Sequence, residues 1–242
     1  KKNIFQKKLL KKYFLIFFLY YYSNKLKFFF RNNNTYDVVI IFKGLYYSRS
    51  CISFLKKKYN NTIFINIDGD DPFNITLPVI SNNEHIKSLQ EYDLIFFWST
   101  KIRNKFIKKY SKIKNKTKIL LFAHENYNTK NNFEFENFFI FYGSWDKARE
   151  DFLNSLTISN LKIFGNGWGK CSNKFKYREN IYSEIYGKRL RKILKNSLGV
   201  VNLFRKQNKN AINMRIFETL SAGGLLITEK SKMVKKILKS KK

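Results

Sequence analysis

Histidine, cysteine and proline are scarce in this sequence of 242 residues, which contains two of each. The cysteines, Cys51 and Cys171, are far apart, and neither belongs to a Cys-x-x-Cys pair. This usage fits a reducing compartment such as the cytoplasm and indicates no zinc site. Because His85 and His124 are the only histidines, a histidine-based metal centre is not expected, and we predict neither a metal nor a cofactor.

Acidic residues are also few: 17 Asp and Glu stand against 48 Lys and Arg, which gives a formal charge of +31. Such a charge suits an anionic partner, whether nucleic acid, an anionic membrane or a phosphorylated small molecule. However, Lys, Asn, Ile, Phe and Tyr are abundant together, as in proteins from AT-rich genomes. The charge alone therefore predicts no partner. Aromatic residues make up 18% of the chain, enough for one large or two small cores.

The first 36 residues lack acidic side chains, since the first acidic residue is Asp37. Their unbroken apolar run, Tyr13 to Tyr22, has ten residues, whereas a membrane-spanning helix needs about 20. No small-residue cleavage site follows, which argues against a signal-peptide core. We prefer a buried or half-buried helix of the first domain over a helix on an anionic membrane surface. The second interpretation places four lysines at the headgroups: Lys7, Lys8, Lys11 and Lys12.

Short apolar runs alternate with helical stretches in the first half of the chain. Strands are expected at 37–42, 62–68, 92–98 and 118–122, and the first of them is expected to be buried. Helices are expected at 50–57, with Ser50 as its cap, and at 100–110. This alternation is typical of a parallel sheet with helices on its faces. Ligands bind beyond the carboxyl ends of the strands in such sheets.

Two adjacent carboxylates, Asp70 and Asp71, follow the second expected strand. A carboxylate there can orient an acceptor hydroxyl or act as a general base. Alternatively, the segment is a turn in which an aspartate bonds nearby backbone N–H groups and Pro72 fixes the bend. For a catalytic role specifically, we favour the turn.

Residues 123–136 are polar and have no apolar period, so we interpret them as a linker between two domains. For His124, within this linker, a surface position is preferred to a catalytic one. The alternation then resumes, with strands at 138–142, 161–164 and 200–204 and helices at 147–156 and 182–197.

The stretch from Asn213 to Glu229 predicts an amphipathic helix, a glycine stop and a buried strand at 225–227. Met214, Phe217 and Leu220 recur at helical spacing and are expected to face a core. Gly223 and Gly224 end the helix, because glycine takes left-handed backbone angles without steric cost. Arg215 and Glu218 lie one turn apart near the helix N-terminus. An arginine there can bind a phosphate group, and a carboxylate one turn further on can accept hydrogen bonds from a ribose.

Two glycine-bearing loops follow the strands at 138–142 and 161–164. Gly143 and Ser144 open the first loop, where glycine lets the backbone approach a ligand, and Arg149 projects from the next helix. Gly165, Gly167 and Trp168 form a Gly-x-Gly-Trp segment in the second. Trp168 either stacks on a nucleobase or packs within the domain. Three basic residues before the last motif can neutralise a diphosphate: Arg205, Lys206 and Lys209.

Four motifs occur in order at strand ends: Asp-Asp-Pro, Gly-Ser…Arg, Gly-x-Gly-Trp and Asn-x-Arg-x-Phe-Glu…Gly-Gly. Together they resemble the group 1 glycosyltransferases of the GT-B fold, most closely their CgeB-like, spore-maturation branch, over residues 37–229. The resemblance implies an α/β protein of two Rossmann-like domains with parallel sheets, apparently shortened at both ends. Residues 1–125 would form the acceptor-side domain, and residues 135–242 would bind the nucleotide-sugar.

The implied function is metal-independent transfer of a sugar from a nucleotide-diphosphate sugar to a glycan, lipid or protein acceptor. Asp70 and Asp71 are the candidate catalytic residues. The nucleotide-sugar would contact Gly143, Ser144, Arg149, Gly165, Gly167, Trp168, Asn213, Arg215, Glu218 and Gly223. The protein would be cytoplasmic, at the inner face of the membrane if it associates peripherally with anionic lipid.

A non-catalytic protein that binds nucleic acid or an anionic membrane is the alternative. Its support is the charge together with the interleaved aromatic residues, which can stack on bases. The lysines are spread along the chain, however, and the sequence contains no nucleic-acid-binding motif. We therefore expect no specific nucleic-acid partner.

Overall fold

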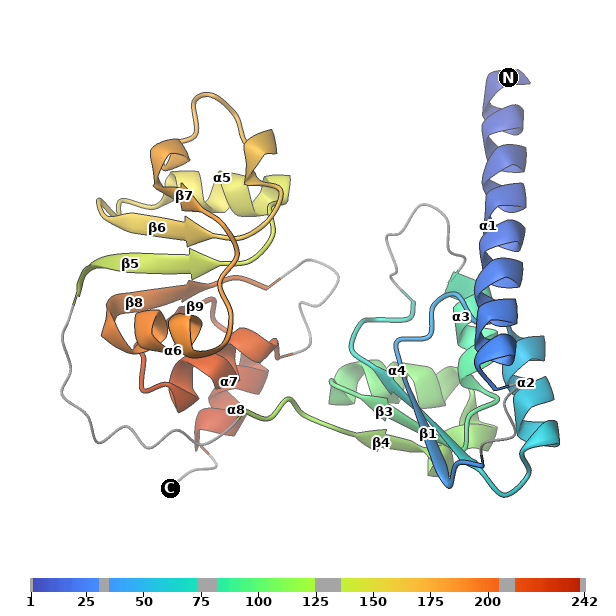
Figure 1. The fold of residues 1–242 in the computed structure, drawn as a ribbon. Coiled ribbons are helices and arrows are strands. Elements are labelled where there is room, and N and C mark those ends of the chain that lie inside the picture. Colours follow the sequence, from blue (N-terminus) through green and yellow to red (C-terminus); the bar gives the residue numbers. More distant parts are fainter. Residues whose placement is uncertain (1, 31–34, 74–81, 125–135, 205–211, 240–242) are drawn as a thin grey trace. The chain divides into compact units, whose positions relative to one another are not determined.

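The computed structural model describes residues 2–30, 35–73, 82–124, 136–204 and 212–239. The described residues up to Leu121 form one compact unit, and those from Phe122 onwards form a second. The first predicted domain ends at residue 125, and the second begins at residue 135. Most of the linker predicted at 123–136 lies outside the described residues. Each unit is an α/β structure with its own parallel sheet (Figure 1).

The first unit contains a parallel sheet of four strands in the order β1-β2-β3-β4. The strands are β1 (Val38–Phe42), β2 (Ile63–Asp68), β3 (Leu94–Phe97) and β4 (Thr117–Ile119). The helices are α1 (Lys2–Phe29), α2 (Arg49–Lys58), α3 (Asn82–Leu89) and α4 (Thr100–Lys109), and a 3₁₀ helix covers Ser111–Lys116. The strands and α4 confirm the predicted alternation, whereas α3 was not predicted.

Serine side chains begin two of these helices. Ser48 caps α2, because its Oγ accepts the Cys51 N–H at 3.2 Å, and Ser99 does the same for Ile102 in α4. The prediction that Ser50 caps α2 is wrong. Ser50 is the second residue of α2, two residues past the cap position, and its hydroxyl lies 3.0 Å from that of Ser48.

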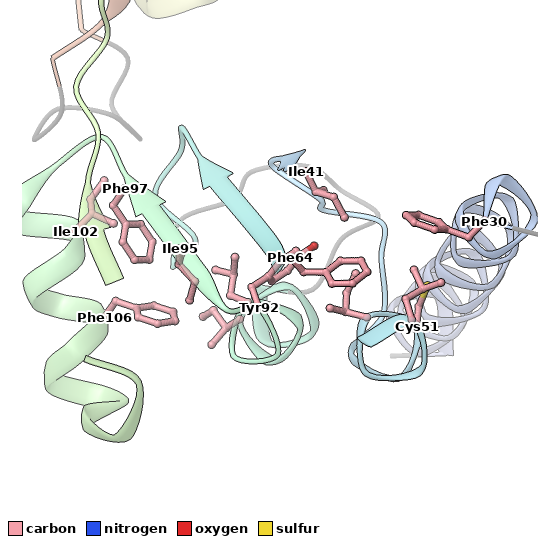
Figure 2. Close-up of a cluster of buried hydrophobic side chains, with 13 residues drawn as sticks. Phe30, Ile41, Cys51, Phe64, Tyr92, Ile95, Phe97, Ile102 and Phe106 are labelled. Carbon is pink, nitrogen blue, oxygen red and sulfur yellow. The ribbon is translucent and has the colours of Figure 1, made fainter. Parts of the chain in front are cut away.

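The core of the first unit lies between the sheet and helices α2, α3 and α4. Figure 2 shows Phe64, Ile95 and Phe97 pointing from the strands toward this side. On the opposite face, Val38, Ile40 and Phe42 of β1 are exposed, and their register partners in β2 are exposed or half-buried. The expectation that the first strand is buried is therefore wrong, because the described helices cover one face of the sheet and β1 lies at its edge.

The apolar run Tyr13 to Tyr22 lies within α1. Ser23 is buried on one side of this helix, where Cys51 Sγ donates to its carbonyl oxygen at 3.5 Å. The exposed fractions of Phe17, Tyr20 and Phe28 are 61%, 70% and 68%. The preferred interpretation is therefore confirmed as a half-buried helix over residues 16–30, because one face packs on the first unit while the face that carries these residues is exposed. Within the described residues, no helix is long and apolar enough to cross a membrane.

The second unit contains a parallel sheet of five strands in the order β7-β6-β5-β8-β9. The strands are β5 (Glu136–Tyr142), β6 (Leu161–Phe164), β7 (Ile181–Tyr182), β8 (Ser197–Asn202) and β9 (Leu226–Thr228). The helices are α5 (Lys147–Ser155), α6 (Gly187–Asn196), α7 (Met214–Ser221) and α8 (Lys232–Lys239), with 3₁₀ turns at Trp168–Lys170 and Arg178–Asn180. The helix predicted at 182–197 is corrected to a short strand, β7, followed by α6.

The buried face of α7 differs in part from the predicted one, since Phe217 packs against a core cluster as predicted. Ile216 and Thr219 are buried, and Ile216 packs with Val234 of α8. Met214 and Leu220, predicted to face the core, are 47% and 42% exposed. The strand after α7 is also more exposed than predicted, because β9 lies at the edge of the sheet.

Candidate functional site

The loops that follow β5 and β6 are in close backbone contact in the second unit. The Gly143 N–H donates to the Phe164 carbonyl at 2.8 Å, and the Trp145 N–H donates to the Asn166 carbonyl at 2.8 Å. Gly143 has a φ of 147° and Gly165 a φ of 155°. A Cβ on Gly165 would lie 2.2 Å from the Gly143 carbonyl oxygen. Only glycine fits at position 165, both sterically and in its backbone angles.

The Trp168 side chain supports this pair of loops. Its indole N–H donates to the Gly143 carbonyl at 2.9 Å. The side chain is 1% exposed, and its ring is stacked with Phe175 at a centroid distance of 5.5 Å. A nucleobase cannot stack on a ring buried in this way. The structure therefore supports the interpretation that Trp168 packs within the domain, and it contradicts the interpretation that Trp168 stacks on a nucleobase.

Replacing Trp168 with phenylalanine is expected to destabilise the protein by about 1–3 kcal/mol. The substitution removes the donor to the Gly143 carbonyl and part of the buried ring. Urea denaturation, with hydrogen exchange of the β5 and β6 peptides, measures the effect. Tyr186→Phe, at an exposed aromatic residue, is the control and should change stability by less than about 0.5 kcal/mol. Equal effects from the two variants would contradict this role of Trp168.

Two arginines from different helices converge on Gly143. A Cβ placed there would lie 2.4 Å from Nη2 of Arg215, in α7, and 3.4 Å from Nη1 of Arg149, in α5. Arg149 is buried; its Nη1 donates to the Ser144 carbonyl at 2.6 Å, and its Nε lies 3.4 Å from Asp146 Oδ2. Two guanidinium groups thus meet at the carboxyl end of β5, where a bound anion can accept hydrogen bonds from both.

A carboxylate lies one turn along α7 from Arg215. Glu218 Oε2 accepts the Tyr142 hydroxyl at 2.8 Å. Burial, followed by the negative charge of Glu218, raises the pKa of Tyr142, so this hydroxyl remains a donor at neutral pH. Tyr142, the last residue of β5, therefore fixes the orientation of Glu218 on α7, one turn from Arg215. Sequence reasoning missed Tyr142, although a polar group at the carboxyl end of a strand was an available signal.

Asn213 joins the end of β8 to the start of α7. Its Nδ2 donates to Asn202 Oδ1 at 2.8 Å and to the Leu203 carbonyl at 3.3 Å, while Asn202 Nδ2 donates to Thr228 Oγ1 at 2.9 Å. Asn213 Oδ1 is buried without a hydrogen-bond partner in the described part of the chain. Asn213 thus sets the position of the α7 N-terminus, and hence of Arg215. Asn202 and Thr228 were not predicted.

Glu150 fixes the loop between Gly143 and α5. Its Oε2 accepts the Trp145 indole N–H at 2.8 Å, and its Oε1 accepts Lys147 Nζ at 2.9 Å and the Ser172 N–H at 3.1 Å. The hydrogen bond from Lys147 is the largest cause that lowers the pKa of this buried carboxyl group. Its contribution to stability is therefore present above its ordinary pKa and is lost as the pH falls through the lowered value. Sequence reasoning missed this residue.

The remaining predicted residues of this unit lie farther from the arginines along their elements. Gly167 precedes Trp168 with a φ of 79°, and Gly223 ends α7 with a φ of 79°. Gly223 confirms the predicted helix stop and lies at the opposite end of α7 from Arg215. His124 Nδ1 lies 3.0 Å from Ser221 Oγ, also at that end. The basic residues Arg205, Lys206 and Lys209 lie outside the described residues.

The paired carboxylates of the first unit lie at the carboxyl end of β2. The Asp70 N–H donates to Asp68 Oδ1 at 3.2 Å, and its carboxylate forms an ion pair with Lys43 at 2.8 Å. Asp71 Oδ1 accepts the Phe73 N–H at 3.0 Å, which is the predicted turn geometry. Both side chains are half-buried. A catalytic role for either residue remains a prediction.

A buried contact between a histidine and an aspartate, which the sequence did not predict, supports this turn. His85 Nε2, on α3, lies 2.8 Å from Asp68 Oδ2, and both side chains are buried. The other oxygen of Asp68 accepts the Asp70 N–H, so the pair anchors the turn to α3. In the described residues, no three His, Cys, Asp or Glu side chains gather as metal ligands.

Comparison with known proteins shows similarity to one protein family in sequence and to several solved structures in fold. Residues 147–242 match the sequence model of a family described as glycosyl transferase-like. This range includes Arg149, Arg215 and Glu218. No curated protein sequence matches the chain significantly.

Similarity to solved structures extends over both units. An E. coli trehalose-6-phosphate protein bound with UDP-2-fluoro glucose matches at 14% identity and a TM-score of 0.53, over 90% of this chain and 63% of its own. The N-terminal domain of Candida albicans trehalose-6-phosphate phosphatase matches at 10% identity and a TM-score of 0.55, over 93% and 62%. S. aureus TarM matches at 11% identity and a TM-score of 0.49, over 76% of this chain and 45% of its own.

The chain therefore spans about half to two thirds of the length of these structures. The predicted fold is confirmed: the protein has the mixed α/β architecture with parallel sheets of the GT-B glycosyltransferases, and its residues 147–242 carry the sequence pattern of a glycosyl transferase-like family.

Proposed function

We propose that this protein transfers a sugar from a nucleotide-diphosphate sugar to an acceptor hydroxyl. The observation that carries the proposal is the convergence of Arg149 and Arg215 on Gly143, with Glu218 one turn beyond Arg215. The E. coli structure with a similar fold is bound with UDP-2-fluoro glucose, and all three side chains fall within the range of the family match. The chemistry of the site and these likenesses point to the same donor class.

In this proposal, the donor diphosphate binds where the two guanidinium groups meet. Arginine binds phosphate oxygens through paired N–H donors, and the first-turn N–H groups of α7 add further donors and a partial positive charge. The missing side chain at Gly143 leaves room for the Arg215 guanidinium, whose Nη2 would lie 2.4 Å from a Cβ at that position. Glu218, oriented by Tyr142, accepts hydrogen bonds from the ribose hydroxyls.

The proposed reaction is metal-independent. As the bond between the sugar and the diphosphate breaks, negative charge grows on the leaving phosphate. Arg149 and Arg215 supply fixed positive charge near that position, so stabilisation requires little reorganisation during the reaction. Asp70 and Asp71 are the candidates in the first unit for orienting or deprotonating the acceptor hydroxyl, which is a glycan, lipid or protein group.

The proposed lineage is the CgeB-like branch of these glycosyltransferases. Its support is the order of the four motifs along the chain, from Asp70-Asp71-Pro72 to the helix that carries Arg215 and Glu218. We also propose a cytoplasmic location, since Cys51 and Cys171 are both free and buried, as is usual in a reducing compartment.

Thermal-shift measurements with UDP, GDP, CDP, dTDP and their sugar conjugates test the donor class directly. A selective rise in melting temperature with one nucleotide in the presence of EDTA is expected, because a ligand that binds only the folded state stabilises it. Glu218→Ala should then weaken binding of that nucleotide by about 1–3 kcal/mol, the range for the loss of a hydrogen bond to a charged group. Isothermal titration with the selected nucleotide measures this loss.

Glu179→Ala is the matched control, since Glu179 is an exposed glutamate in the 3₁₀ turn Arg178–Asn180. It should leave nucleotide affinity unchanged. Equal affinity in Glu218→Ala and the unmodified chain would remove the ribose role from Glu218. A folded chain that responds to none of the nucleotides would argue against the donor class itself.

A further inference from the structure

One face of α1 carries a stripe of exposed aromatic side chains. This aromatic stripe consists of Phe17, Tyr20, Tyr21 and Phe28, all of which are exposed. Their spacing of three, four and seven residues places them on one side of a helix. Monomeric soluble proteins rarely expose contiguous apolar patches of this kind without a binding role.

The opposite face of the same helix holds α1 to the first unit. Ser23 and Phe30 are buried there, and Leu26 packs against the core cluster that contains Phe30, Cys51 and Leu55. The Ser48 N–H donates to Ser23 Oγ at 3.2 Å. Figure 1 shows the C-terminal turns of α1 beside α2. The orientation of the helix is therefore fixed by packing, and the aromatic stripe is the face that this packing leaves uncovered.

Lysines flank the aromatic stripe. Lys25 Nζ lies 5.3 Å from the ring centre of Tyr21, and Lys27 Nζ lies 4.9 Å from that of Phe54, an exposed residue of α2. Toward the N-terminus, α1 also contains Lys7, Lys8, Lys11 and Lys12, and it has no acidic residue. Aromatic rings bordered by lysines are the composition of helices that lie at a membrane surface.

The net charge of the chain distinguishes between the partners that could bind the aromatic stripe. A second copy would bring another chain of charge +31 against the same basic helix, and the repulsion opposes such a dimer. An anionic lipid surface attracts the lysines, at about 1 kcal/mol for each one near the surface, while its acyl boundary accepts the rings. We therefore propose that α1 docks on anionic membrane surfaces through the aromatic stripe, lying in the interface without crossing it.

Co-sedimentation of the full chain with vesicles tests this proposal. Vesicles of phosphatidylcholine with 30% phosphatidylserine, taken as roughly physiological in charge, are compared with phosphatidylcholine alone. The unmodified chain should bind the anionic vesicles and bind neutral vesicles far more weakly. The variant Phe17→Ser/Tyr20→Ser/Phe28→Ser should lose affinity for anionic vesicles by at least about tenfold, since three exposed rings leave the interface.

The control variant is Tyr182→Ser/Tyr186→Ser/Leu225→Ser, which removes three exposed apolar side chains from the second unit without changing the charge. It should bind the anionic vesicles within about twofold of the unmodified chain. Circular dichroism and melting temperatures establish that both variants remain folded. Equal losses in the two variants, no loss in the stripe variant, or no binding by the unmodified chain would each overturn the proposal.

A titration with single-stranded RNA addresses the other anionic partner. Rings bordered by lysines can also stack on bases, so the same two variants are measured with a labelled oligonucleotide. The docking proposal predicts equal RNA affinity for both. A loss of RNA affinity confined to the stripe variant, with vesicle binding unchanged, would overturn the proposal and assign the face to nucleic acid.

Discussion

Replacing Gly165 with alanine is expected to destabilise the second unit by about 3 kcal/mol and to abolish nucleotide-induced stabilisation. The new Cβ would lie 2.2 Å from the Gly143 carbonyl oxygen, and the φ of Gly165 is 155°, which L side chains rarely adopt. The obstruction is backbone, which cannot rotate away as a flexible side chain can. The loops after β5 and β6 must separate, and that moves Gly143 away from the two arginines. Urea denaturation and thermal shifts with the selected nucleotide measure the two effects.

Gly169→Ala is the matched control. Gly169 lies four residues further on, and a Cβ there meets no atom within 4 Å. Its stability should change by less than about 0.5 kcal/mol, as at other exposed positions. Hydrogen exchange should show increased opening in the β5 and β6 peptides of Gly165→Ala alone. Normal stability and nucleotide response in Gly165→Ala would mean that the two loops do not make the close contact described here.

His85→Ala should destabilise the first unit by about 3 kcal/mol, because it removes a buried side chain and one hydrogen-bond partner of the buried Asp68 carboxyl group. The substitution leaves the buried Asp68 carboxylate without the imidazole that lies 2.8 Å away. The exposed pair between Lys87 and Glu84, also 2.8 Å apart, is the control. Lys87→Ala should cost less than about 1 kcal/mol, since solvent already screens those charges. Urea denaturation followed by circular dichroism measures both.

The double variant Asp68→Asn/His85→Ala separates the buried charge from the lost packing. Asparagine keeps an acceptor for the Asp70 N–H, which now bonds Asp68 Oδ1 at 3.2 Å, and carries no charge. The double variant should therefore be more stable than His85→Ala. If it is equally unstable, the charge of Asp68 is not the cause. Because Asp68 joins α3 to the Asp70 turn, hydrogen exchange of that turn should rise in His85→Ala.

The two substitutions probe parts of the protein that sequence reasoning reached to different degrees. Gly165 was selected from a Gly-x-Gly-Trp segment, and the structure supplies the reason for the glycine, which is contact between two backbones. The Asp68–His85 pair was missed entirely. A histidine on a helix and an aspartate on a strand, seventeen residues apart, form no local pattern that indicates their meeting.

The sequence by itself determined the α/β class, the alternation of strands and helices, and the positions of the four motifs at strand ends. These features depend on local periodicity and on glycine, which act over a few residues. Tertiary structure alone decided which stripe of α7 is buried, because Ile216 packs against Val234 of α8 while Met214 and Leu220 fit the same helical spacing. It also decided that Trp168 is a support, that Tyr142 holds Glu218, and that α1 presents aromatic rings outward. Each of these depends on which neighbour from a distant part of the chain occupies one side of a residue, and periodicity does not contain that information.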